Sequence, residues 1–150
     1  MTVPPGRAWF DRFQDAFCRA DLDAIWAMQT SASHALTLAR LAETIAQARR
    51  DPNVEKALRD RMGPDVRDLT PKEVWTAYTQ ASCEHAAKGH MVWEYVGEES
   101  DGDRVVVRLK PGGNRPLPAG MDGELVQVLV QEKDGEWRLD KPLSEELAAS

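Results

Sequence analysis

The sequence contains little cysteine, since Cys18 and Cys83 are the two thiols among 150 residues. They lie far apart and form no CxxC pair, so the sequence carries no signature of a zinc site or of a disulfide framework. We therefore expect no metal and no cofactor. We expect each cysteine to be a small buried apolar residue.

The chain also lacks long apolar segments. It has no run of about eighteen apolar residues, the length that a membrane-spanning helix needs. Its first residues, Met1 to Arg7, lack the apolar stretch of a secretory signal. Both absences predict a cytoplasmic protein that does not have a membrane as its partner.

Clustered positive charge is missing as well. The formal net charge is −6, and residues 1–88 hold 12 basic and 12 acidic side chains, whereas residues 89–150 hold 7 basic and 13 acidic ones. Because a duplex-binding surface needs clustered Lys and Arg against phosphates, we expect no nucleic acid as a partner. The acidic excess is explained most simply by solubility. An acidic immunity- or inhibitor-type protein that binds a basic partner is an alternative.

The first 89 residues read as helices. Aromatic residues at helical spacing from Trp9 to Phe17 predict a first helix with one apolar face, and Asp21 is the expected N-cap of a short second helix. Further helices are expected from Ser31 or Ser33 to Arg50, from Pro52 to Met62, and from the capping box Thr70-Pro71-Lys72-Glu73 to Gly89.

The period changes from 3.6 to 2 at His90, which predicts strands. Four are expected, at residues 90–96, 104–110, 124–132 and 137–140, with Lys141-Pro142 ending the last one and Asp134-Gly135 turning the final hairpin. Residues 111–120 hold three prolines and three glycines and predict a connection without regular structure. Helices followed by strands indicate a single α+β domain over residues 1–150.

Three segments resemble the NTF2-like superfamily, which includes SnoaL-type cyclases and ketosteroid isomerases. They are residues 13–26, where an aromatic helix breaks at Ala20-Asp21 before a short helix, the helix that starts at Thr70, and the closing hairpin at residues 133–140. The resemblance implies N-terminal helices packed on a strongly curved antiparallel sheet of about four strands. It also implies a pocket between the concave face of that sheet and the helices.

The five tryptophans could either fill the core or line that pocket. Core filling is the simpler explanation, and the alternative is a pocket for a flat apolar ligand or an interface. The candidate ligand-binding residues are Trp93 and Tyr95 on the first strand, Trp137 on the last strand, and Trp75.

An enzyme of the SnoaL or ketosteroid-isomerase kind, whether isomerase, cyclase or dehydratase, would need acid and base groups that converge in the pocket. The catalytic candidates are His85, Tyr95 and Asp21. Motifs of the GxSxG, GxGxxG and GxxxxGK types do not occur.

The lack of a convergent acid/base set favours a non-catalytic domain. We expect it to bind a small apolar ligand or a protein partner and to form a homodimer through the outer face of its sheet. Val106, Leu125 and Leu129 are expected on that outer face.

Overall fold

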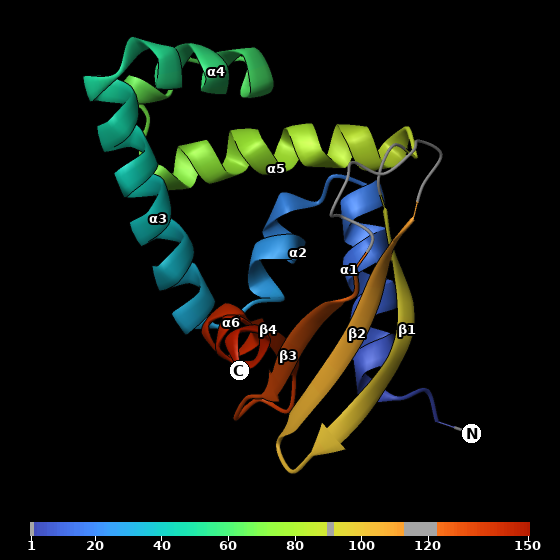
Figure 1. The fold of residues 1–150 in the computed structure, drawn as a ribbon. Coiled ribbons are helices and arrows are strands. Elements are labelled where there is room, and N and C mark those ends of the chain that lie inside the picture. Colours follow the sequence, from blue (N-terminus) through green and yellow to red (C-terminus); the bar gives the residue numbers. More distant parts are fainter. Residues whose placement is uncertain (1, 90–91, 113–122) are drawn as a thin grey trace.

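The computed structural model describes residues 2–89, 92–112 and 123–150 (Figure 1). In these residues the chain forms the predicted α+β fold, with five α-helices before a four-stranded antiparallel sheet and a sixth helix after it. The helices are α1 (Pro5–Cys18), α2 (Leu22–Ala27), α3 (Ser31–Arg50), α4 (Pro52–Met62), the short 3-10 helix η1 (Val66–Asp68), α5 (Pro71–Ala87) and α6 (Lys141–Ala149). The strands, in sheet order, are β1 (Val92–Asp101), β2 (Arg104–Gly112), β3 (Leu125–Gln131) and β4 (Trp137–Asp140).

Most helices begin at caps that the sequence displays. The Thr70 hydroxyl accepts the Glu73 N–H at 3.2 Å, and the Glu73 carboxylate accepts the Thr70 N–H at 2.9 Å, so both halves of the predicted capping box form. Asp21 caps α2, as predicted, by accepting the Ala24 N–H at 3.2 Å. Helix α3 is capped by Thr30 and not by Ser31 or Ser33.

One helix was not predicted. Lys141-Pro142 does not simply end β4, because Asp140 accepts the Leu143 N–H at 3.0 Å and proline occupies the first turn of α6. The Ser144 hydroxyl accepts the Val128 N–H at 2.8 Å. The β3–β4 ladder ends at Val128, where β4 is too short to accept the Val128 N–H. Helix α6 accepts it instead, through Ser144.

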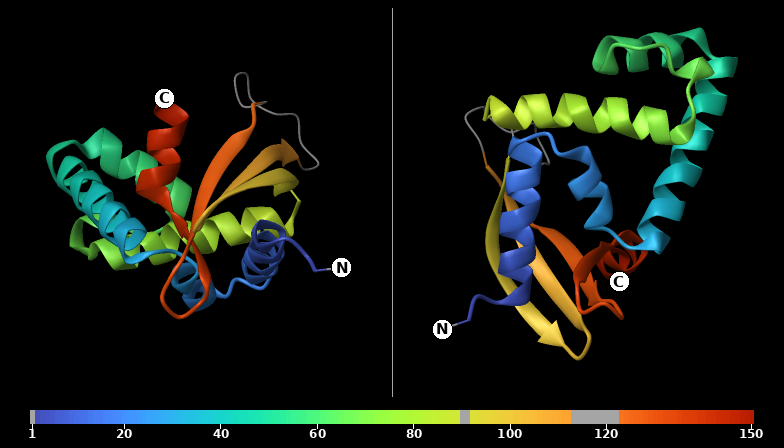
Figure 2. Two further views of the ribbon diagram at one scale, coloured as in Figure 1. Left: turned by 90° about the horizontal axis from the view of Figure 1, so that it is seen from below. Right: turned by 180° about the vertical axis from the view of Figure 1, so that it is seen from behind.

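The main core lies between α1 and the inner face of the sheet (Figures 1 and 2). Trp9 is 0 % exposed and packs with Phe10 against strand residues that include Val107 and Leu129. The Trp9 indole N–H donates to the Met28 carbonyl at 3.2 Å. The protein's own aromatic side chains therefore fill the space between α1 and these strands.

The remaining helices extend away from the sheet as an arm formed by α3, α4 and α5. In Figures 1 and 2, α3 runs from α6 to α4, and α5 returns across to the C-terminal end of α1. The far end of this arm has a separate small core, made of Ile45, Ala48, Val66 and Val74.

The register of the sheet corrects the expected outer face. Val106 pairs with Val128, whereas Leu129 pairs with Val105 and is 0 % exposed in the Trp9 core. Leu125 packs against the same core. Placing Leu125 and Leu129 on the outer face was wrong, because both faces of β3 are apolar and alternation alone does not say which face is buried.

Two other expectations change. Cys83 is buried, as expected, but Cys18 is exposed at the end of α1. Pro111 and Gly112 belong to β2, although a connection without regular structure was predicted from residue 111 onward. The rest of that predicted connection, from residue 113, lies outside the described residues, as do His90 and Met91.

Candidate functional site

Tyr95 lies at the N-terminal end of α1 and is held by Glu98. Its hydroxyl donates to Glu98 Oε1 at 2.7 Å. The same carboxylate accepts the N–H groups of Gly6 at 3.0 Å and Arg7 at 2.8 Å. Burial, reinforced by the hydrogen bond to Glu98, raises the pKa of Tyr95 to about 12. Tyr95 is therefore a neutral phenol that helps to anchor α1 on β1.

The structure does not bring the catalytic candidates Tyr95 and Asp21 together. Asp21 follows the C-terminal end of α1 and caps α2, whereas Tyr95 is tied to the first turn of α1. The 14 residues of α1 span about 20 Å at 1.5 Å per residue. His85 is exposed in the last turn of α5.

The aromatic candidates divide between two clusters. Trp93, Tyr95 and Trp137 are partly buried and pack against the Trp9 core. Trp75, 7 % exposed, belongs to a second cluster with Ala16, Ile25 and Cys83.

Beside Trp75 lies a small group of stacked rings. The Trp26 ring meets Trp75 edge-on at 4.7 Å between centroids and stacks on His34 at 3.9 Å. His34 Nε2 lies 2.7 Å from the Trp26 carbonyl oxygen, so the imidazole contacts both the ring and the backbone of Trp26.

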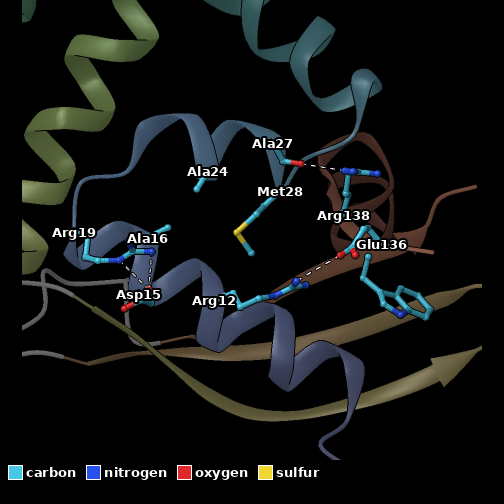
Figure 3. A pocket seen from close by; sticks show the side chains of 10 residues that line it. Arg12, Asp15, Ala16, Arg19, Ala24, Ala27, Met28, Glu136 and Arg138 are labelled. Atoms are coloured by element: carbon cyan, nitrogen blue, oxygen red, sulfur yellow. Dashed lines mark hydrogen bonds and ion pairs between the residues drawn. The ribbon is translucent and has the colours of Figure 1, made fainter. Parts of the chain in front are cut away.

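A surface pocket of about 400 Å³ lies between α1, α2 and the start of β4 (Figure 3). Ala16, Ala24, Ala27 and Met28 give it small or apolar walls, and of the four aromatic candidates Trp137 is the one that lines it. Its volume falls within the range of small-molecule sites, about 300–1,000 Å³.

Five charged side chains surround this pocket, three arginines and two carboxylates. Arg19 binds Asp15 through two nitrogens, at 2.9 and 2.8 Å. Arg138 donates to the Ala27 carbonyl at 3.0 Å and binds Asp134 at 2.8 Å.

Arg12, also at this pocket, makes one long contact, 3.4 Å, with Glu136 (Figure 3). The sequence analysis missed this pair, because its members are 124 residues apart and no local pattern connects them.

The outer face of β1 and β2 carries two columns of opposite charge. Glu94, Glu99 and Asp101 form the acidic column on β1, and Arg104, Arg108 and Lys110 form the basic column on β2. Lys110 and Glu94 form an ion pair at 3.5 Å.

Apolar side chains accompany these columns. Val96 is 41 % exposed and Val106 is partly exposed. In Figures 1 and 2, α1 lies on the opposite side of β1 and β2, so among the described residues this face is not covered by a helix.

The described part of the chain contains no group of three or more His, Cys, Asp or Glu side chains placed to hold a metal ion. Within the same residues, no helix has the length and apolarity to cross a bilayer. The chain matches no family model, no curated protein and no solved structure. The case for a function therefore rests on the side chains themselves.

Proposed function

We propose that the chain is a non-catalytic NTF2-like domain that forms a homodimer through the outer face of its sheet. The order of helices before a four-stranded antiparallel sheet, with α1 against the inner face, supports the NTF2-like part. A strongly curved sheet belongs to the same proposal. The observation that carries the dimer is the pair of oppositely charged columns, side by side on a face that no described helix covers.

This arrangement is self-complementary under two-fold symmetry. Consider a two-fold axis that lies in the interface, parallel to the strands and above the line between β1 and β2. This axis places β1 of one copy over β2 of the other. Because Asp101 pairs with Arg104 and Glu94 pairs with Lys110 across the two strands, Asp101 and Glu94 of one copy then face Arg104 and Lys110 of the other. An isologous interface forms every such contact twice.

The valines supply the apolar part of the interface. Val96 and Val106 lie among the two columns, on the face that would be covered. Facing sheets pack with their strands nearly aligned, about 30° apart, which agrees with an axis along the strands. We expect the charged pairs to set the register and the valines to provide most of the stabilisation.

The proposal is tested by a charge swap. Asp101→Arg and Arg104→Glu should each weaken the dimer, because each places like charges opposite one another. An equimolar mixture of the two variants should restore dimers, since residue 101 of one copy and residue 104 of the other then again carry opposite charges at both symmetry-related contacts. Sedimentation velocity and light scattering after size exclusion measure the oligomeric state.

Lys133→Glu is the matched control for Arg104→Glu, because it makes the same charge change in the exposed β3–β4 turn, away from this face. It should leave the dimer unchanged. A wild-type chain that is strictly monomeric at the highest concentration reached refutes the proposal. So does a mixture of the two variants that stays monomeric while the wild type dimerises.

A further inference from the structure

We propose that the pocket between α1, α2 and β4 binds a small anion with an apolar body, and that Arg12 receives its carboxylate. This goes beyond self-association and does not depend on it. The pocket is lined by helix and β4 residues, whereas the proposed dimer uses the outer face of β1 and β2.

The apolar half of the ligand is selected by the walls of the pocket. Alanines at positions 16, 24 and 27 leave a space that larger side chains would fill, and Met28 points into it (Figure 3). Trp137 adds an aromatic surface. Methionine adapts to irregular apolar shapes, so these walls suit a flat or short hydrocarbon body better than a sugar or a peptide backbone.

The charged half of the ligand is selected by the one lining arginine that is weakly bound. Each of the three lining arginines pairs with a carboxylate, Arg12 with Glu136, Arg19 with Asp15 and Arg138 with Asp134. Arg19 and Arg138 are each held by hydrogen bonds of 3.0 Å or less. Two nitrogens of Arg19 are therefore committed to Asp15, and the guanidinium of Arg138 is committed to Asp134 and to a backbone carbonyl.

Arg12 forms fewer and longer hydrogen bonds than these two arginines. A guanidinium has five N–H donors, and within the described part of the chain Arg12 uses one of them, in the 3.4 Å contact with Glu136. Both side chains of this pair are more than half exposed, at 57 % and 56 %. Exposed ion pairs of this kind contribute little to stability, so exchanging Glu136 for another carboxylate costs little.

A ligand carboxylate can improve on this contact. Arginine and carboxylate prefer two parallel N–H···O bonds, whereas Glu136 offers Arg12 one. In our proposal the ligand carboxylate takes the place of Glu136 on Arg12, and Glu136 turns toward the solvent. A cationic ligand would lose this contact and would be repelled by the Arg12 guanidinium.

The experiment uses three probes that share one body and differ in charge. They are naphthalene-2-carboxylate, 2-naphthalenemethanol and 2-naphthylmethylammonium, titrated into the full-length protein and followed by ¹H–¹⁵N chemical shifts. We expect the carboxylate to shift the Trp137 indole and the Met28 amide, with a Kd roughly tenfold or more below that of the alcohol, as a charge-assisted hydrogen bond implies. The ammonium probe should bind most weakly.

Three variants locate the binding. Arg12→Gln should remove the preference for the carboxylate and leave the alcohol unaffected, and Glu136→Gln should tighten the carboxylate, because it removes the charged competitor. Ala24→Phe should abolish the binding of all probes by filling the pocket. Arg12 and Glu136 are exposed, so unchanged spectra elsewhere and an unchanged melting temperature will show that these variants fold.

The proposal fails if the carboxylate and the alcohol bind equally, or if Arg12→Gln keeps the preference. It also fails if the shifts map away from Trp137 and Met28, or if none of the probes produces shifts up to its solubility limit.

Discussion

Replacing Glu98 should loosen the first helix from the sheet. The N-terminus of α1 has no cap of its own, because Pro4 supplies no side-chain acceptor and the first turn contains no acidic residue. Glu98, on β1, supplies both functions from 92 residues away by accepting the Gly6 and Arg7 N–H groups. Glu98→Ala therefore removes the cap, the favourable charge at the helix N-terminus and the acceptor of the Tyr95 hydroxyl.

The expected loss follows from these contacts. A missing helix cap costs about 0.5–2 kcal/mol, a missing charge at a helix N-terminus about 0.3–1 kcal/mol, and a partly buried hydroxyl without its acceptor about 1 kcal/mol or more. These effects overlap, so we expect Glu98→Ala to lower the free energy of unfolding by about 2–4 kcal/mol. Glu98→Gln keeps one acceptor oxygen and should cost about half as much.

Urea denaturation, at one fixed protein concentration, measures these changes. The matched control is Glu43→Ala, which removes an exposed carboxylate from α3, away from the sheet, and should change stability by no more than about 0.5 kcal/mol. A double-mutant cycle with Tyr95→Phe should show coupling between Tyr95 and Glu98. The reasoning is refuted if Glu98→Ala is no more destabilising than Glu43→Ala.

Two further predictions concern the same corner of the fold. Gly6→Ala should lower the free energy of unfolding, measured in urea, by about 1–3 kcal/mol, because its Cβ would lie 2.7 Å from Cγ2 of the fully buried Val107. Gly123→Ala is the control and should have little effect, since no atom lies within 4 Å of its added Cβ. Equal effects of the two substitutions would contradict this prediction. Tyr95 has a folded pKa of about 12 against an ordinary value of 10.0, so its stabilising effect is complete below pH 10 and is lost as the pH rises toward 12. Tyr95→Phe should therefore show a smaller loss of stability than wild type between pH 10 and pH 12, and parallel curves would contradict the assignment.

Local chemistry accounts for the parts of the fold that could be predicted. The capping box at Thr70, the Asp21 cap and the change to alternating residues each depend on neighbours within a few positions, and each has its counterpart in the structure. Helix α6 was missed even though Asp140 and Pro142 repeat the cap-plus-proline signal that Asp51 and Pro52 gave for α4. Because residues 137–140 have a strand pattern, Lys141-Pro142 was interpreted only as the end of that strand.

Contacts between distant segments account for what could not be predicted. Glu98 reaches α1 across 92 residues, and Arg12 reaches Glu136 across 124. Neither pair leaves a spacing in the sequence, because each exists only after the sheet has packed on α1. The inner face of β3 was ambiguous for a related reason. One face of the strand carries valines and the other carries leucines and glutamines, and the packing against Trp9 decides which face is buried.

The same packing is the basis of our proposal that the chain binds and does not catalyse. A general acid or base needs a pKa near the working pH, but the pKa of Tyr95 lies at about 12 and its hydroxyl is bound to Glu98. Asp21 is used as a helix cap. The core between α1 and the sheet is occupied by Trp9, which is fully buried. Among the described residues, Arg12 at the pocket and the two charged columns of the outer sheet face still have hydrogen bonds or ion pairs to offer. These are the places where we propose that a ligand or a second copy binds.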